Sequence, residues 1–294
     1  MIHTLDLRFQ TDSAIAAFLI ETREGPMLVE CGPHSTFERL RSELARYGYR
    51  PEDIRKVLLS HIHFDHAGAA WAFAQAGAIV YVHPAGWKHL QDPARLYQSA
   101  KRIYGDLMET LWGEMHSIPE AQLIAVEDGA AVELGEYTFT AWHTPGHAVH
   151  HIAWETEAGI FTGDVGGVKI LGGPVVPPCP PPDIDLEAWQ ASIARLRALA
   201  PARLYLTHYG AVDDVAAHLD ALESRLLDWG AWMKIRFEAG RTVQDVTPEF
   251  QAYAADQLRD AGIPDEIVRK YEAANPAFMS VAGLLRYWEK RSAL

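Results

Sequence analysis

The amino-acid sequence predicts an α/β fold followed by a helical region, and three features of its hydrophobic pattern support this. In the first half of the chain, short apolar runs typical of strands alternate with segments of helical periodicity. Between residues 123 and 162, strand-like runs follow one another with short turns between them. Beyond about residue 212 the sequence has no strand pattern. We therefore expect an α/β domain over residues 1–211 and a helical region over residues 212–294.

The first half of the chain is predicted to contain four strands and two helices. The strand-like runs are residues 14–20, 27–30, 55–60 and 79–82, and the helical segments are residues 35–47 and 67–76. Ser35 and Glu38 have the spacing of a capping box at the start of the first helix. Gly77 follows the second helix, where a glycine commonly ends one.

Residues 87–117 interrupt this alternation with a segment of helical composition, which we interpret as an insertion in the α/β domain. The insertion is dense with large side chains, namely Trp87, Tyr97, Tyr104, Met108, Trp112 and Met115. The chain then returns to strand-like runs, which predict a second, largely antiparallel sheet from residues 123–126, 131–134, 137–142, 151–155 and 159–162.

The last part of the chain begins with residues 172–182, whose six prolines predict a stiff, extended loop. Asp185 is expected to cap a helix that ends at residue 199, and residues 203–206 are predicted to form one more strand. Thr247 and Asn275 each precede a proline, which predicts a capping residue followed by proline at the first helical position.

Charge and composition argue against several classes of protein. The formal net charge of −13 is unlike that of proteins that neutralise nucleic-acid phosphates with a basic surface. The apolar runs are far shorter than the roughly 20 residues that a membrane span needs, and the N-terminal residues carry charges instead of an apolar signal region. Cys31 and Cys179 are expected to be reduced and buried. We predict a cytoplasmic protein with a small-molecule substrate and no nucleic-acid or membrane partner. The sequence does not decide between a monomer and a homodimer.

The most informative segment is Ser60-His-Ile-His-Phe-Asp-His, which directly follows an aliphatic strand. His61 and His63 are two residues apart on an extended stretch, so their side chains project to the same side. Asp65 and His66 come after a turn and can face a second point in space. One short loop could therefore supply ligands to two metal ions.

Three further residues of ligand type follow strand-like runs later in the chain. They are His147 in Thr-Pro-Gly-His, Asp164 in Thr-Gly-Asp, and His208 in Leu-Thr-His. Loops at strand ends are where α/β scaffolds collect functional groups. We therefore expect these three side chains to converge with the histidine loop.

In this order, the patterns H-x-H-x-D-H, T-P-G-H, G-D and a late His resemble the metallo-β-lactamase fold superfamily, over about residues 14–210. The resemblance implies an αβ/βα four-layer sandwich with a dinuclear metal site on one edge, so that residues 1–211 would be the catalytic domain. By position, it implies that one metal is held by His61, His63 and His147, the second by Asp65, His66 and His208, and that Asp164 bridges the two.

The residue types of this set indicate a catalytic site. Imidazoles and carboxylates suit zinc, with iron or manganese as alternatives, and no cysteine biases the set toward a structural zinc site. Two divalent ions can share a water and lower its pKa toward about 7, which gives a bridging hydroxide as nucleophile for an activated carbonyl. Asp65 could take up a proton as the tetrahedral intermediate collapses. Tyr209 is a candidate hydrogen-bond donor to the developing oxyanion, as are Tyr97 and Tyr104 if the insertion folds over the metals.

Several neighbouring residues have other expected roles. His151 begins a predicted strand and is interpreted as a packed residue that supports a ligand. His34 and His83 are interpreted as turn residues at strand ends. Glu30 occupies a position where the superfamily has Asp, a departure that affects the expected support of the histidine loop and not metal binding.

Within the superfamily, the pattern is most similar to the glyoxalase II-like and lactonase-like branch. This resemblance implies hydrolysis of a small acyl ester, lactone or thioester, with the insertion and the proline-rich loop as candidate substrate walls. The alternatives are a mononuclear iron sulfur dioxygenase that oxidises persulfides, and a non-catalytic metal-binding module. The retention of Asp65, His66 and His208 argues against the dioxygenase, which uses fewer ligands. The sequence does not identify the substrate.

Overall fold

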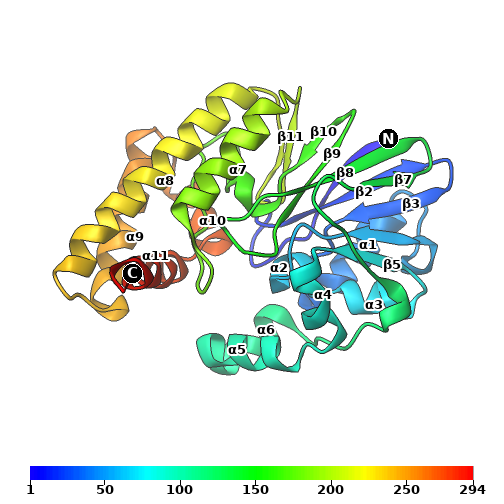
Figure 1. Ribbon diagram of the computed structural model, residues 1–294, viewed down its shortest axis with the longest axis horizontal. Coiled ribbons are helices and arrows are strands. Elements are labelled where there is room, and N and C mark those ends of the chain that lie inside the picture. Colours follow the sequence, from blue (N-terminus) through cyan, green and yellow to red (C-terminus); the bar gives the residue numbers. More distant parts are fainter. Residues whose placement is uncertain (294) are drawn as a thin grey trace. The chain divides into compact units, whose positions relative to one another are not determined.

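The computed structural model describes residues 1–293 and contains two six-stranded sheets (Figure 1). The first sheet has the order β1 (Ile2–Asp6), β2 (Ala16–Thr22), β3 (Gly25–Val29), β4 (Lys56–Leu58), β5 (Ile79–Val82) and β6 (Leu123–Ala125). The second sheet has the order β12 (Gly210–Val212), β11 (Leu204–Leu206), β10 (Gly159–Phe161), β9 (Ile152–Thr156), β8 (Tyr137–His143) and β7 (Ala131–Leu134). The predicted α/β class is confirmed.

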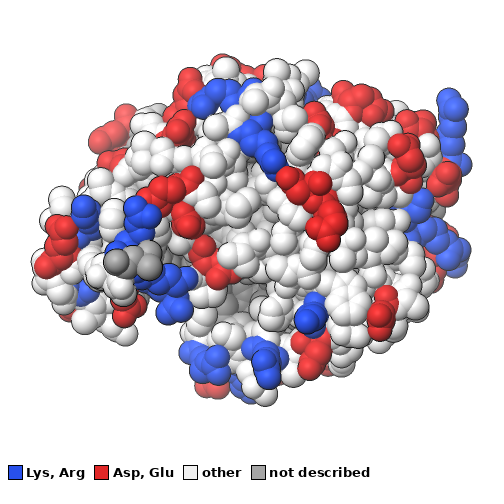
Figure 2. Space-filling model, in the orientation of Figure 1, with Lys and Arg blue, Asp and Glu red and all other residues white. Residues whose placement is uncertain are grey.

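The chain divides into two compact units. The first unit contains Met1–His143 and Ile152–Phe161, and the second contains Thr144–His151 and the chain from Thr162 onward. The predicted boundary at residue 211 stays a prediction. Over the described residues, no helix combines the length and the apolar character that a membrane crossing would require. On the face shown in Figure 2, acidic and basic side chains are interspersed.

In the first unit, the two sheets pack face to face through buried aromatic residues. The ring of Phe18 on β2 lies 5.2 Å from that of Phe161 on β10, edge to face. Trp154 on β9 donates its indole N–H to the carbonyl of Leu59, just after β4. Helices α1 (Phe37–Ala45) and α3 (Ala70–Gln75) contact β1 and β5. Because Val57, Leu58 and Leu59 are fully buried and Leu59 also accepts from Trp154, the histidine loop starts from the core.

Three strands differ from the sequence prediction. The first, β1, was not predicted. Residues 123–126 were expected in the second sheet, but β6 pairs parallel with β5, with Leu123 opposite Val80. The helical insertion serves as the crossover between these two parallel strands, a connection that needs a dozen or more residues. β12 was not predicted because it is a three-residue return strand that begins at a glycine. It is a strand because it pairs with β11, and a pairing of this kind is not visible in the residues of β12 alone.

The predicted capping box at Ser35 is wrong. The segment begins as a 3-10 turn, η1 (His34–Thr36), and neither η1 nor α1 has a side-chain cap. Ser35 Oγ instead donates to the carbonyl of Leu111 at 2.6 Å, so this hydroxyl holds the insertion in place. The helix expected over residues 67–76 is divided into α2 (Phe64–Ala67) and α3, which ends before Gly77.

The two expected Pro-containing helix starts also need correction. Pro248 lies inside α9 (Val243–Asp260), which begins earlier because Thr242 and Asp245 form a capping box there. Helix α11 (Ala277–Ser292) begins after Pro276, without a side-chain cap. Asn275 instead donates its amide to the carbonyl of Pro177 at 3.3 Å. In both cases, interactions outside the local dipeptide decide where the helix begins.

The insertion is helical, as expected, with α4 (Pro84–Gln91), α5 (Ala94–Tyr104), η3 (Gly105–Leu107) and α6 (Met108–Trp112). His83 caps α4, since its Nδ1 accepts from the backbone N–H of Ala85 at 3.0 Å. Its Nε2 lies 3.1 Å from Nδ1 of His143, and Nε2 of His143 lies 3.0 Å from the carbonyl of Val126. Because Nδ1 of His83 accepts, its Nε2 carries the proton and donates to Nδ1 of His143. Nε2 of His143 in turn donates to the carbonyl of Val126, so both rings are neutral tautomers.

In the second unit, Asp185 caps α7 (Leu186–Ala198) as predicted, by accepting from the N–H of Ala188. Helix α8 (Val215–Glu238) packs on α7, and α11 packs on α8 and α9. The proline-rich segment is extended and is held by these C-terminal helices. Tyr271 on α10 (Asp265–Ala274) donates to the carbonyl of Pro174 at 2.7 Å, and Gly283 on α11 lies against the carbonyl of Cys179.

The neutral state of His83 leads to a prediction about the pH dependence of stability. Burial, with a smaller effect of His143, lowers the pKa of His83 from 6.5 to about 4. Its contribution to folding is therefore complete above pH 6.5 and is lost as the pH falls toward 4, because the unfolded chain takes up the proton first. We expect His83→Asn, which keeps a capping oxygen but does not titrate, to lose less stability between pH 7.5 and 5 than the wild type.

Urea unfolding at the two pH values measures this difference. His89→Asn, at an exposed position of the same helix, is the matched control and should keep the wild-type pH dependence. An unchanged pH dependence in His83→Asn would contradict the prediction.

Candidate metal centre

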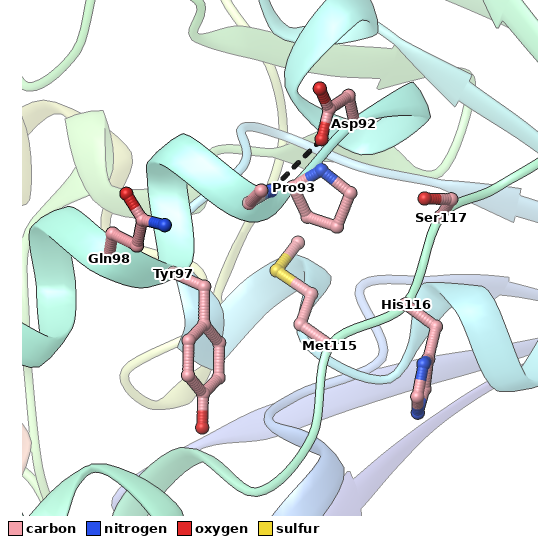
Figure 3. Close-up of a pocket in the computed structure, with 8 residues that line it drawn as sticks. Asp92, Pro93, Tyr97, Gln98, Met115, His116 and Ser117 are labelled. Atoms are coloured by element: carbon pink, nitrogen blue, oxygen red, sulfur yellow. Dashed lines mark hydrogen bonds between the residues drawn. The ribbon is translucent and has the colours of Figure 1, made fainter.

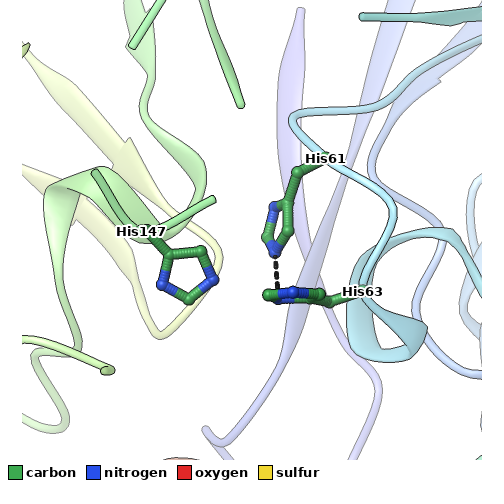
Figure 4. Close-up of side chains that lie close together, drawn as sticks. All are labelled: His61, His63 and His147. Carbon is green, nitrogen blue, oxygen red and sulfur yellow. Dashed lines mark hydrogen bonds between the residues drawn. The ribbon is translucent and has the colours of Figure 1, made fainter. Parts of the chain in front are cut away.

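The histidine loop connects β4 to α2 in the first unit. Residues up to His63 are extended, and the chain turns there because the N–H groups of His66 and Ala67 both donate to the carbonyl of His63. The rings of His61 and His63 are nearly perpendicular, with Nε2 of His61 2.9 Å from Nδ1 of His63 (Figure 4). His61 and His66 are fully buried. The predicted shared direction of His61 and His63 is therefore observed.

Ser60 and Glu30 orient the rings of His61 and His66 through their Nδ1 atoms. Nδ1 of His61 lies 2.9 Å from Ser60 Oγ, and Nδ1 of His66 lies 3.3 Å from Glu30 Oε1. The same Glu30 oxygen accepts from the backbone N–H of Ser60 at 3.2 Å. These contacts turn Nε2 of His66 toward Asp65, at 3.7 Å. Glu30 therefore supports the loop although it is one methylene longer than the Asp of the superfamily pattern.

The second unit brings together His147, Asp164 and His208. Nε2 of His147 lies 3.3 Å from Asp164 Oδ2, and Nε2 of His208 lies 3.3 Å from Asp164 Oδ1. All three side chains are buried. They come from the loop after β8, from η5 (Gly163–Gly166) after β10, and from the connection between β11 and β12. Each oxygen of one carboxylate therefore faces a different imidazole, as a bridging ligand would require.

These side chains are oriented by a surrounding set of hydrogen bonds. Nδ1 of His147 lies 2.9 Å from the carbonyl of Pro178. His151 accepts from the backbone N–H of Asp164 with Nε2 at 3.2 Å and contacts Thr144 Oγ1 with Nδ1 at 2.8 Å, which is the supporting role expected for it. Gly146 must be a glycine, because a Cβ there would lie 2.3 Å from the Cα of Trp189.

Sequence reasoning missed His218 on α8. Its Nε2 donates to the carbonyl of Gly166 at 2.8 Å and so fixes the end of η5, two residues after Asp164. Burial lowers the pKa of His218 to about 4, which keeps the ring neutral. No local pattern marks this residue, since a histidine inside an amphipathic helix is usually a surface or core residue. Only the packing of α8 in the second unit gives it this role.

The insertion packs on the histidine loop within the first unit. The ring of Phe64 lies 6.2 Å from Tyr97 and 6.1 Å from Trp112, and that of Trp112 lies 5.2 Å from Tyr104. Burial, and then the charge of Asp65, raise the pKa of the Tyr104 hydroxyl. The insertion therefore contacts Phe64 of the histidine loop, and the roles of Tyr97 and Tyr104 toward an oxyanion stay predictions. Tyr209 directly follows His208 in the second unit and is partly exposed.

The outer side of the insertion carries a separate cavity of about 380 Å³ (Figure 3). It is lined by Asp92, Pro93, Ala94, Tyr97, Gln98, Met115, His116 and Ser117. None of the predicted metal ligands lines this cavity. Tyr97 and Met115, two of the large side chains of the predicted insertion, therefore face this cavity in addition to packing within the insertion.

The donor chemistry of both clusters fits divalent metal ions. One cluster consists of the imidazoles of His61, His63 and His147, the other combines imidazoles with the carboxylates of Asp65 and Asp164, and neither cysteine belongs to either. In metal sites, a ligating histidine commonly engages its second nitrogen with a carboxylate, a carbonyl or water. His66 on Glu30 and His147 on Pro178 follow this arrangement.

Comparisons with known proteins agree with this chemistry. Residues 11–208 match the family model described as the metallo-beta-lactamase superfamily. A metallo-beta-lactamase fold-containing protein of Sulfurisphaera tokodaii is 31% identical over 160 residues, which are 53% of this chain and 60% of that protein. An N-acyl homoserine lactonase of a Bacillus species is 30% identical over 46% of this chain and 57% of its own length. An atrochrysone carboxyl ACP thioesterase of Aspergillus fumigatus is 25% identical over 80% of this chain and 52% of its own length.

The fold has close counterparts among solved structures. A metallo-beta-lactamase family protein of Thermus thermophilus aligns with a TM-score of 0.72 and 19% identity, over 99% of this chain and 94% of its own. An archaeal superfamily protein of Sulfolobus tokodaii aligns with a TM-score of 0.62 and 24% identity, over 78% and 85%. These likenesses concern the fold, whereas the family model concerns the sequence and covers most of the chain. This chain belongs to the metallo-beta-lactamase superfamily.

Proposed function

We propose that this protein is a dinuclear metal-dependent hydrolase that cleaves a small acyl ester, lactone or thioester. The observation that carries the proposal is the Asp164 carboxylate, whose two oxygens each face a histidine at 3.3 Å. A carboxylate placed in this way suits two ions at once. Two relatives are named a lactonase and a thioesterase, and both names describe cleavage of an acyl bond to oxygen or sulfur.

In this proposal the seven donors divide between two ions. His61, His63 and His147 would hold the first, and Asp65, His66 and His208 the second, with Asp164 shared between them. Zinc is the expected ion, and iron or manganese is the alternative, because the set contains imidazole and carboxylate donors only. When bound, two such ions would polarise the acyl group and lower the pKa of a water.

The side chains of the protein would complete the reaction. The Asp65 carboxylate would take the hydroxyl proton that the attacking hydroxide brings to the tetrahedral intermediate, and pass it to the leaving oxygen or sulfur as the intermediate collapses. Tyr209 would donate a hydrogen bond to the oxyanion that develops on the acyl group. Tyr104 is a second candidate donor, because the charge of Asp65 acts on its hydroxyl. The insertion would form one wall of the substrate site.

A hydrolysis screen on the metal-loaded protein tests the proposal. We expect turnover of at least one class among aliphatic and N-acyl lactones, S-lactoylglutathione and p-nitrophenyl esters, with about two metal ions per chain on the same sample. One iron per chain, with oxygen consumption on glutathione persulfide, would instead indicate a sulfur dioxygenase. Stoichiometric metal without turnover of any substrate would indicate a non-catalytic metal-binding module.

Substitution of single predicted ligand residues tests the metal assignment. We expect His63→Ala and Asp164→Ala to lower metal content and to reduce kcat by roughly a thousandfold or more, since both the water and the acyl group lose their activation. Metal analysis and steady-state kinetics measure the two effects together. His89→Ala, at an exposed histidine, is the control for loss of an imidazole. Near-normal activity in a metal-verified ligand variant would refute the assignment.

The role of Tyr209 is tested by Tyr209→Phe, which removes only the hydroxyl. We expect kcat to fall by roughly a hundredfold with little change in KM or metal content, as for loss of one oxyanion donor. Tyr104→Phe is the comparison variant. If it lowers kcat more than Tyr209→Phe does, the oxyanion donor is Tyr104 and the assignment of Tyr209 is wrong.

A further inference from the structure

Leu171, in the loop that follows η5, combines two unfavourable features. Its φ is +48°, in the left-handed region that a bulky L-residue rarely adopts. Its side chain is also 52% exposed. The other non-glycine residues with positive φ among those described are polar or, as Ala200, small. A single exposed leucine needs no explanation by itself, but an exposed leucine that also strains the backbone does.

The turn that carries Leu171 does not need a leucine in order to form. Gly173 donates its N–H to the carbonyl of Ile170 at 2.9 Å and so closes the turn. The hydroxyl of Tyr271 accepts from the N–H of Ile170 at 3.0 Å and donates to the carbonyl of Pro174 at 2.7 Å. These bonds fix the backbone on both sides of Leu171 without using its side chain. The fold therefore requires the left-handed φ, which a glycine would adopt without strain.

The same turn is attached to two predicted metal ligands. Val168 pairs with His208 in a parallel bridge, and the N–H of Lys169 donates to the carbonyl of His208. Asp164 lies in η5, shortly before Val168. Leu171 is in the same compact unit as both ligands. A rigid turn at this place can present an apolar side chain to a molecule bound at these ligands without the cost of ordering a loop.

The loop of His147 also has an exposed aliphatic side chain. Val149 is 56% exposed, whereas its neighbours Ala148 and His150 are buried. Both of these ligand-bearing parts of the second unit, the loop of His147 and the turn paired with His208, therefore present an apolar side chain to the surface. Metal ions take nitrogen, oxygen and sulfur donors, so the aliphatic side chains would serve another part of the substrate.

We propose that Leu171 binds an apolar chain of the substrate next to the bond that is cleaved, and that it makes the enzyme selective for substrates with an extended chain of this kind. This rests on the proposed function and narrows its substrate class away from small polar acyl groups such as lactoyl. Contact with the chain removes the exposed face of the leucine and the chain itself from water. A substrate with a short chain gains little from the same contact.

The test uses pairs of substrates that differ in the length of the apolar chain. The pairs are p-nitrophenyl acetate and octanoate, S-acetyl and S-octanoyl N-acetylcysteamine, and γ-valerolactone and γ-undecalactone. Leu171→Asn introduces a polar side chain of similar shape that tolerates a positive φ. We expect kcat/KM to fall roughly tenfold for the long-chain substrates, mainly through KM, and by less than about twofold for the short-chain ones. Metal content should not change.

Leu171→Gly separates contact with the substrate from a role in folding. It should show the same selective loss, while its midpoint of urea unfolding stays equal to that of the wild type or rises, because glycine relieves the strain. Ala200→Gly is the matched control, since Ala200 has the same φ of +48° just after α7. It should leave the ratio of long-chain to short-chain kcat/KM unchanged.

Equal losses on both chain lengths, or no loss, would overturn the proposal. A lower unfolding midpoint in Leu171→Gly with unchanged selectivity would overturn it as well, because the leucine would then serve the fold. If the wild type prefers the short-chain substrates or cleaves S-lactoylglutathione alone, this assignment fails while the hydrolase function stands. If it cleaves no acyl substrate, both fail.

Discussion

A buried carboxylate destabilises a fold unless it is paired or binds a metal, and much of the second unit serves to place the carboxylate of Asp164. Its oxygens face His147 and His208, and its backbone N–H donates to His151. The turn η5 that carries it is held by His218 from α8 through the carbonyl of Gly166. Trp189 from α7 donates to the carbonyl of Val165 in the same turn. Two helices therefore serve to place one acidic side chain.

The first unit positions its predicted ligands with fewer structural elements. Its four predicted ligands lie in six consecutive residues, so one strand end and one supporting carboxylate are enough to hold them. Glu30 contacts both the backbone of Ser60 and the ring of His66, and it is itself only 1% exposed. This economy explains why the histidine loop is recognisable in sequence. The spacing of the ligands is local, and so is the geometry that follows from it.

What could be predicted from the sequence followed the same division between local and non-local interactions. The histidine loop, the strand ends at His147, Asp164 and His208, and the cap at Asp185 depend on short segments, and the structure places them as expected. Other features depend on partners far along the chain. The parallel pairing of β6, the use of Ser35 to hold Leu111, and the contact of His218 with Gly166 join segments that no short pattern connects.

The proline-rich segment has a consequence for proton positions. A prolyl residue has a carbonyl but no N–H, so a run of prolines offers acceptors without donors. Side chains from distant parts of the second unit use them: Tyr271 on Pro174, Asn275 on Pro177, His147 on Pro178 and Lys290 on Pro182. Because Pro178 can only accept, Nδ1 of His147 must carry the proton. In the neutral ring the Nε2 lone pair then lies on the side that faces Asp164 Oδ2. An acceptor-only stretch of backbone thus sets the tautomer in which Nε2 can act as a metal ligand.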